Sequence, residues 1–290
     1  MLSIPANAAQ SKGVFRQMHT IPEKIIDFHT HILPCFDDGP SSCAEAAQML
    51  VKLREQGVTH AVSTSHFYRY DETVSDFLKR REEAYSQLRS FLSENGISDI
   101  PEIILGAEVY FSTALADDPL LEKLCIENTD HILIELPYSK LTANIIDSYR
   151  NLACCGRVRP VLAHIERYAA FAGEDVIFEL TELSPAQINC ESVMSTAGAR
   201  LVSKLIRRGA VCAFGSDAHN MGVRAPRYSD GMKKLSRRLG ANVFTEIMES
   251  SAAILENSDI GPGGKYYAQI RSCFIGKQGS KISRKNNFHG

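Results

Sequence analysis

Apolar residues gather into seven short runs, each followed by a longer segment with helical spacing of apolar positions. Short apolar runs predict β-strands, and strands that alternate with helices predict βα units around a parallel sheet. The predicted strands cover Lys24–His31, Thr59–His66, Glu102–Phe111, His131–Pro137, Arg159–Ile165, Ala186–Glu191 and Ala210–His219. The pattern therefore predicts an α/β fold.

The first predicted helix has clear signals at both ends. Ser42 precedes Glu45 by three residues, which is the spacing of a capping box, and Gly57 is typical of a helix end. Between them, apolar residues recur at helical intervals at Ala46, Met49, Leu50 and Leu53. We expect a helix here with one face in the core.

Polar residues decide between two architectures that share this βα pattern. His, Asp and Glu occur at or near the carboxyl end of almost every predicted strand. A (β/α) barrel places its active site there with contributions from many strands, whereas an open sheet uses one crevice. We therefore predict a closed or nearly closed barrel.

The chain divides into three predicted segments. Residues 1–23 are aperiodic and resemble an N-terminal arm, and residues 24–260 carry the barrel. Residues 261–290 contain six Gly and six Lys or Arg without an acidic residue, which is typical of a flexible basic tail.

Composition and charge exclude several classes of function. The 290 residues are 44% hydrophobic, with 32 basic and 34 acidic side chains and a net charge of −2, so no global basic field attracts nucleic acid. Apolar runs are too short for a transmembrane segment, and no signal-peptide layout begins the chain. We expect a cytoplasmic protein.

The eight cysteines predict no disulfide framework, because none are in C-x-x-C spacing and several lie in apolar runs. No cysteine is followed six residues later by Arg, so the phosphate loop of thiol-based phosphatases is missing. Cleavage of a phosphate ester would proceed without a phosphocysteine.

The end of the first predicted strand carries the strongest local signal. Side chains alternate along a strand, so Asp27, His29 and His31 point the same way. The Cα atoms of neighbouring members of this set lie about 6.6 Å apart. The loop that follows adds Asp37 and Asp38. Two converging imidazoles near carboxylates indicate a metal site.

Further donors follow the other predicted strands. Two of them, Glu108 and Glu135, are embedded in apolar runs, where an unpaired charge would cost several kcal/mol. A bound metal would compensate these buried charges, and ion pairs with arginine are the alternative without a metal. The candidate donors are His29, His31, His66, His164, His219, Glu108, Glu135, Asp217 and either Asp37 or Asp38. Nine donors without a thiolate suit two or three Mn, Fe or Zn ions.

The same residues carry a family resemblance. His-x-His with Asp-Asp-Gly, Thr-Ser-His, Gly-Ala-Glu, Ile-Glu-Leu-Pro, Ala-His-Ile-Glu-Arg-Tyr and Ser-Asp-Ala-His-Asn occur in this order. The series resembles the polymerase and histidinol phosphatase (PHP) superfamily, and more closely its bacterial tyrosine phosphatases of capsular and exopolysaccharide operons. The resemblance spans about residues 24 to 257.

This resemblance implies a distorted (β/α)7 TIM-like barrel, the PHP fold, with three metal ions, typically manganese. It assigns His29, His31, Glu108 and Asp217 to the first ion. It assigns Glu108, Glu135 and His164 to the second, and Asp38, His66 and His219 to the third. Asp38 is preferred over Asp37 because it directly precedes Gly39.

The resemblance also implies the reaction. Arg167 and Arg224 match the family's phosphate-contacting arginines, the second more loosely. Apart from the resemblance, Asp37 or a metal-bound water is the candidate proton donor. The expected function is hydrolysis of phosphotyrosine on proteins, with a bacterial tyrosine kinase as partner and a homo-oligomer possible. The alternatives are a phosphatase for histidinol phosphate or another small phosphomonoester, and a metal-stabilised binding module without turnover.

Aromatic residues near the strand ends allow two interpretations. Phe67, Tyr68, Tyr70 and Tyr110 could line an entrance that stacks on a phenyl ring, or pack loops onto the barrel. The sequence does not separate these roles.

Overall fold

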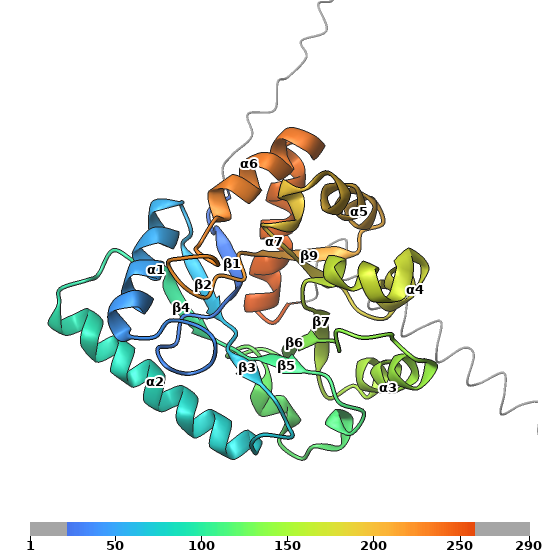
Figure 1. Cartoon of the computed structure of the whole chain (residues 1–290), viewed down its shortest axis with the longest axis horizontal. Helices are drawn as coiled ribbons and strands as arrows, with labels where there is room; N and C mark the ends of the chain where they lie inside the picture. The colour runs from blue at the N-terminus through green and yellow to red at the C-terminus, as the bar shows by residue number, and fades with distance from the viewer. Residues whose placement is uncertain (1–21, 259–290) are drawn as a thin grey trace, which may run out of the picture.

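A computed structural model of the protein describes residues 22–258, with strands in the middle and helices around them (Figure 1). The predicted tail and residues 1–21 of the predicted arm lie outside the described residues. The strands are β1 Ile26–Thr30, β2 His60–Ser63, β3 His66–Phe67, β4 Glu102–Leu105, β5 Glu108–Tyr110, β6 His131–Glu135, β7 Arg159–Leu162, β8 Ala186–Asn189 and β9 Val211–Gly215.

Helices follow most of these strands along the chain. The α-helices are α1 Cys43–Glu55, α2 Val74–Glu94, α3 Ala143–Cys154, α4 Ala169–Leu183, α5 Thr196–Arg207, α6 Tyr228–Leu239 and α7 Ala241–Leu255. Short 3-10 helices cover Leu115–Asp117, Leu121–Leu124, Ile165–Tyr168 and Ser192–Met194. Among the described residues, no helix is both long enough and apolar enough to cross a membrane.

All strand pairs are parallel, so the predicted α/β class is confirmed. Residues 22–258 contain two sheets, with the strand orders β1-β2-β4 and β3-β5-β6-β7-β8-β9. An isolated parallel bridge between Thr30 and Ala218 links the end of β1 to the segment after β9. This arrangement brings the carboxyl ends of β1 and β9 together.

Two predicted strands are each interrupted where the first sheet gives way to the second. The run 59–66 forms β2 and β3, and the run 102–111 forms β4 and β5. At the two breaks, the backbone N–H of Thr64 donates to Thr30 and that of Gly106 donates to Ser63. These hydrogen bonds follow the last pairs of the first sheet, Thr30 with Ser63 and Ser63 with Leu105, and apolar periodicity alone does not predict where that sheet ends.

The ends of α1 agree with the sequence signals. The Ser42 side chain accepts a hydrogen bond from the N–H of Glu45, and Gly57 adopts a φ of 90° just after the helix. The Glu45 carboxylate accepts backbone hydrogen bonds from Ser41 and Met221 instead of from the expected Ser42, so the capping box is incomplete. The predicted apolar face of this helix is buried.

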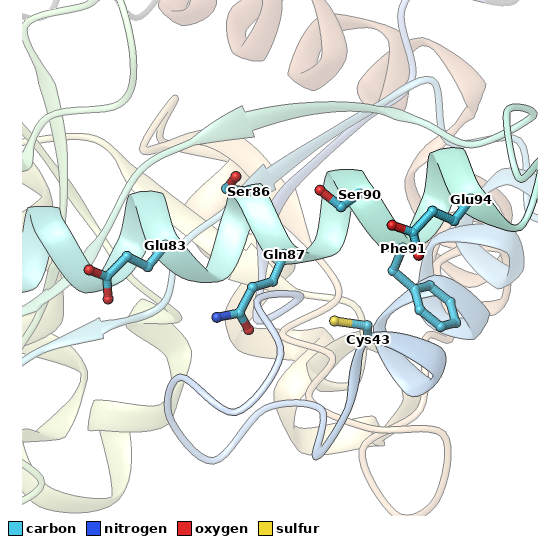
Figure 2. A pocket seen from close by; sticks show the side chains of 7 residues that line it. All are labelled: Cys43, Glu83, Ser86, Gln87, Ser90, Phe91 and Glu94. Atoms are coloured by element: carbon cyan, nitrogen blue, oxygen red, sulfur yellow. The ribbon is translucent and has the colours of Figure 1, made fainter.

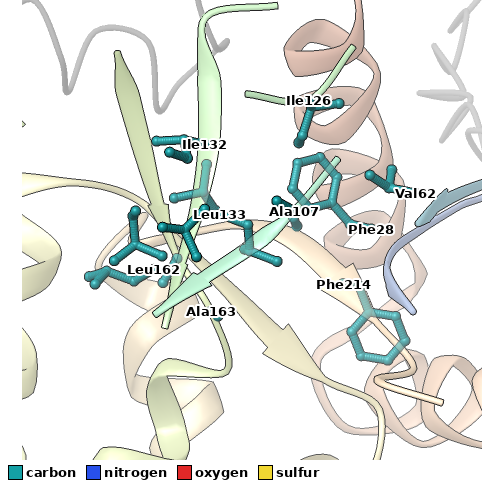
Figure 3. Close-up of a cluster of buried hydrophobic side chains, with 14 of the residues drawn as sticks. Phe28, Val62, Ala107, Ile126, Ile132, Leu133, Leu162, Ala163 and Phe214 are labelled. Carbon is teal, nitrogen blue, oxygen red and sulfur yellow. The ribbon is translucent and has the colours of Figure 1, made fainter. Parts of the chain in front are cut away.

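Alternation along β1 separates the core from the site. Ile26 and Phe28 belong to the buried apolar cluster, part of which Figure 3 shows, while Asp27 and His29 belong to the opposite face of the strand. Removing a large side chain such as Phe28 would cost about 3–5 kcal/mol. This apolar packing fixes the strand ends that carry the polar groups.

Candidate metal centre

The side chains of all nine predicted ligands converge in one region, near the carboxyl ends of β1, β6, β7 and β9 and the amino ends of β3 and β5. They form overlapping groups whose donor atoms, within each group, lie within 4.8 Å of one another. The groups are His31, Asp38, His66 and His219; His29, Glu108 and His164; His29, His31 and Asp217; and His66, Glu108 and Glu135. Within residues 22–258, the groups of three or more such donors all lie in this region.

The two histidines of the His-x-His motif face each other. Their Nε2 atoms are 3.3 Å apart, and Glu108 Oε2 lies 3.1 Å from that of His29 and 3.2 Å from that of His31. Asp217 Oδ1 lies 3.6 Å from the first and 3.7 Å from the second of these nitrogens. Four buried donors aimed at one point suit a shared cation better than a single shared proton.

A second pair of carboxylates lies beside this point. Glu108 Oε1 is 2.7 Å from His164 Nε2, and Glu135 Oε1 is 3.6 Å from the same nitrogen. Burial, and then the neighbouring charge of Glu108, raises the pKa of Glu135 to about 8. Burial alone would raise the pKa of Glu108 too, but His29 and the hydrogen bond from His164 hold it well below its usual range. A cation between Glu108 and Glu135 would allow both carboxylates to be ionised side by side.

The third group contains two imidazole nitrogens without hydrogen-bond partners. Asp38 Oδ1 lies 3.2 Å from His219 Nε2 and 3.5 Å from His66 Nε2. His219 Nε2 and His66 Nδ1 are buried and accept or donate no hydrogen bond. Burial lowers the pKa of His66 to about 4, so its ring is neutral at pH 7, as a metal ligand must be. These residues therefore fit bound metal ions.

The backbone is unusual at two of these positions. His164 has a φ of 30° and Asp217 a φ of 52°, in the left-handed region that non-glycine residues rarely adopt. The predicted strand Arg159–Ile165 consequently ends early, at Leu162, and the predicted strand Ala210–His219 ends at Gly215. Such strain persists where the surroundings hold a residue in a required position.

β9 passes so close to β1 that position 215 has to be glycine. A Cβ atom there would lie 2.6 Å from the Cβ of His29 and 2.8 Å from Gln187 Nε2. Both are buried side chains, so neither can move away cheaply.

Asp37 lies behind His31. Its Oδ2 atom accepts hydrogen bonds from His31 Nδ1 and the N–H of His66, both at 2.9 Å, and its Oδ1 atom accepts one from Gly39. Burial would raise the pKa of Asp37, but the charge and hydrogen bond of His31 hold it below its usual range. This geometry suits a group that orients His31, and suits poorly the proton donor expected from the sequence.

Gln187 orients the other histidine of the motif. Its Oε1 atom lies 3.1 Å from His29 Nδ1 and accepts a 2.8 Å hydrogen bond from the backbone of His164. Its amide donates to Asn189, which in turn donates to Asp217. One buried chain of hydrogen bonds thus connects three candidate ligands.

Arg167 and Arg224 flank the cluster from two sides. Arg167 Nη2 lies 2.5 Å from one oxygen of Asp217, and Arg224 Nη2 donates to the other at 2.8 Å. Arg224 also donates to Asp38 through Nη1 at 3.2 Å. Both predicted arginines therefore reach the cluster, including the one with the looser motif match.

A pocket of about 240 Å³ opens above the cluster. Candidate ligands form its floor, and the two arginines line it together with Tyr68, Tyr110 and Tyr138. Of the aromatic residues considered from the sequence, Tyr68 and Tyr110 line the entrance, whereas Phe67 is buried in the core.

A larger hollow of about 570 Å³ lies on the outer surface of α2, near Cys43 (Figure 2). Its lining includes the carboxylates of Glu83 and Glu94, which join no group of closely spaced donors. Its size therefore does not make it the functional site.

Residues 25–256 match the sequence profile of a family described as "Capsular polysaccharide synthesis, CpsB/CapC". The chain belongs to this family. CpsB/CapC relatives include the tyrosine-protein phosphatase CpsB of Streptococcus pneumoniae, which is 29% identical over 77% of this chain and 94% of its own length. The tyrosine-protein phosphatase YwqE of Bacillus subtilis is 26% identical over 81% of this chain and 93% of its own length.

A solved structure supports the fold of this CpsB/CapC member. It belongs to a set of crystal structures of YwqE from Bacillus subtilis and CpsB from Streptococcus pneumoniae, described as metal-dependent tyrosine phosphatases. The match has a TM-score of 0.70 and 24% identity, over 82% of this chain and 96% of the other. At this identity the likeness concerns the fold.

Sequence reasoning missed Gln187 and Tyr138 as site residues of this CpsB/CapC member. Gln187 offers one signal, because an amide in the middle of a buried strand needs partners. Tyr138 offers no such signal, because a tyrosine that follows a strand often packs a loop and need not line a site.

Proposed function

We propose that this chain hydrolyses phosphotyrosine in proteins, within capsular or exopolysaccharide synthesis, and that a bacterial tyrosine kinase is its substrate. The observation that carries the proposal is the convergence of nine nitrogen and oxygen donors with two arginines on one pocket. The relatives named as tyrosine-protein phosphatases support the choice of phosphotyrosine.

We assign three metal ions to the cluster. His29, His31, Glu108 and Asp217 would hold the first, Glu108, Glu135 and His164 the second, and Asp38, His66 and His219 the third. Bound ions would lower the pKa of a water molecule and stabilise negative charge on the reacting oxygens. We propose manganese as the resident metal, and the same donors would accept Fe or Zn.

The arginines would bind the phosphoryl group. Guanidinium groups present pairs of N–H donors that match phosphate oxygens, and Arg167 and Arg224 approach the pocket from different elements. In the described structure both donate to carboxylates, chiefly to Asp217. A phosphate bound in the pocket would offer both arginines a further acceptor.

The leaving group needs little help from an acid. A phenol has a pKa near 10, far below that of an alkyl alcohol, so tyrosinate leaves without full protonation. We therefore propose that Asp37 positions His31 and does not transfer a proton. Its three hydrogen bonds support this role.

The finer predictions of architecture and setting belong to the same proposal. We propose that the two sheets together make the distorted (β/α)7 barrel, and the bridge between Thr30 and Ala218 supports this closure. The cytoplasm stays the expected compartment from the sequence, and a homo-oligomer stays possible.

The decisive experiment compares two substrates on metal-stripped protein before and after Mn²⁺ is added. We expect restored phosphate release from a phosphotyrosine peptide and none from histidinol phosphate. Release from histidinol phosphate alone would contradict the proposed substrate, and no release from either would favour a binding module without turnover.

Two histidine variants control this experiment. His31→Ala should abolish the Mn²⁺-dependent rate. His60→Ala should retain it, because His60 lies at the amino end of β2 and pairs with Glu102 instead of the cluster.

A further inference from the structure

One wall of the pocket is a series of aromatic rings that leads outward from the cluster. The ring of His66 lies 5.2 Å from that of Tyr68, and the ring of Tyr68 lies 5.6 Å from that of Tyr70. Tyr110 contacts both tyrosines, with ring centroids 5.5 Å from Tyr68 and 6.2 Å from Tyr70. The series ends in solvent, where Tyr70 is 71% exposed.

A second series of rings leaves the cluster on another side. The ring of His164 lies 5.9 Å from that of Tyr138, which lies 6.1 Å from that of Phe171. Tyr138 lines the pocket, whereas Phe171 lies outside it, and both are 43% exposed. Each series therefore has an inner tyrosine at the pocket and an outer ring beyond it.

The outer rings, Tyr70 and Phe171, lie outside the buried apolar cluster, whereas Tyr138 also stacks on the buried ring of Tyr168. The exposed large apolar side chains of residues 22–258 are seven, and three of them are Tyr70, Tyr138 and Phe171. A fourth, Val223, is 99% exposed and directly precedes Arg224 of the pocket. Apolar groups around a strongly polar pocket mark a surface for binding.

We propose that the outer rings, Tyr70 and Phe171, bind apolar side chains that flank phosphotyrosine in the substrate polypeptide, while Tyr68, Tyr110 and Tyr138 enclose its phenyl ring. This inference rests on the proposed function and adds a preference for the residues around the phosphotyrosine. A small phosphomonoester would not extend to the outer rings.

The direction of the pocket favours a polypeptide as the occupant. The phosphoryl group would bind at the floor, between the arginines, so the rest of the substrate has to leave through the mouth. A polypeptide backbone there places its neighbouring side chains over the rim, where the outer rings lie. Offset or edge-to-face contacts between rings contribute to binding beyond the buried area alone.

The test measures kcat/KM on three substrates. They are p-nitrophenyl phosphate, a phosphotyrosine peptide with Gly and Ser on both sides, and the same peptide with Leu and Phe on both sides. The protein is the Mn²⁺-loaded full chain, compared with the variants Tyr70→Ala and Phe171→Ala. Tyr85→Ala is the control for loss of a tyrosine ring, because Tyr85 lies on α2 outside the pocket lining, half-buried and with its ring beside Arg89.

We expect the wild type to prefer the apolar-flanked peptide over the Gly/Ser peptide. Each outer-ring variant should reduce this ratio of kcat/KM by about fivefold through a higher KM, which is the size of one lost aromatic contact. Tyr85→Ala should leave the ratio as in the wild type.

Different outcomes separate this inference from the proposed function. If the wild type releases phosphate from neither peptide, the proposed function fails. If it hydrolyses both peptides but the variants keep the wild-type ratio, or lose activity equally on all three substrates, the outer rings have no binding role. A change in oligomeric mass in either variant would instead assign these rings to a contact between copies of the chain.

Discussion

The two ends of the first three predicted strands carry similar residue types in different surroundings. Toward their carboxyl ends, His29, His31 and Glu108 are buried together. At the amino ends, His60 lies 3.4 Å from Glu102, whose side chain is 70% exposed. Burial and convergence, and not residue type, therefore distinguish a candidate metal centre from ordinary surface pairs.

The largest expected difference between the two ends is between two glutamates of one predicted strand. Glu108→Gln should reduce phosphotyrosine hydrolysis by about a thousandfold, because a ligand shared by two ions supplies several kcal/mol of charge stabilisation. Glu102→Gln, six residues earlier at the amino end, should change the rate less than about twofold. Equal effects of the two changes in a phosphate-release assay would remove the distinction between the ends.

Two arginines on either side of β7 give the next comparison. Arg167→Lys should lower kcat/KM by about 10- to 100-fold, because lysine cannot donate two parallel hydrogen bonds to phosphate. Arg157, which precedes the strand, pairs with the exposed Glu122, so Arg157→Lys should retain the wild-type rate. A wild-type KM and kcat in Arg167→Lys would exclude the proposed phosphate clamp.

The positioning role of Asp37 predicts a loss of metal affinity. Asp37→Asn should weaken Mn²⁺ binding by about 10- to 100-fold, the usual effect of removing a partner of a ligand histidine. Saturating Mn²⁺ should restore most of the rate. Failure of metal to rescue the variant would favour the proton-transfer role, and Asp99→Asn, at an exposed pair with Arg54, controls for charge.

The raised pKa of Glu135 predicts how the stability of the metal-free protein depends on pH. Its folded pKa of about 8 exceeds the ordinary 4.5, so its contribution to stability is full below pH 4.5 and is lost as pH rises to 8. Glu135→Gln should therefore raise the Tm of chelator-treated protein at pH 8 by about 3 °C. The same change should abolish Mn²⁺-dependent activity. A lower Tm in thermal melts from pH 5 to 9 would contradict this sign.

Thiol chemistry should have the smallest effect. Burial raises the pKa of Cys125 to about 12, so its thiol stays protonated and unreactive at pH 8. Exposed thiols such as Cys154 should react with iodoacetamide while the rate falls less than about twofold. A chelator should abolish the rate, and the opposite sensitivity would exclude the metal mechanism.

Short-range patterns predicted much of the fold and the candidate cluster. Two-residue alternation placed His29 and His31 on one side of the chain at the end of β1, and embedded acids marked Glu108 and Glu135 as groups in need of partners. Both signals work because strand geometry and the cost of burying charge act locally.

What the sequence could not predict depends on contacts between distant segments. Asp37 and Asp38 differ in role because the Asp37 carboxylate accepts a hydrogen bond from His31 Nδ1. Gln187 acts on His29 of β1 and on His164 just after β7, both far away in the sequence. The left-handed backbone of His164, which ends a predicted strand early, follows from the same crowding.

The most direct test measures phosphate release from a phosphotyrosine peptide against Mn²⁺ bound per chain, in one series of metal-stripped samples. The account predicts no release without metal, a rise as ions bind, and a plateau at about three ions per chain, the number expected if bridging carboxylates share the nine donors. Hydrolysis at the full rate by protein without metal would contradict the account.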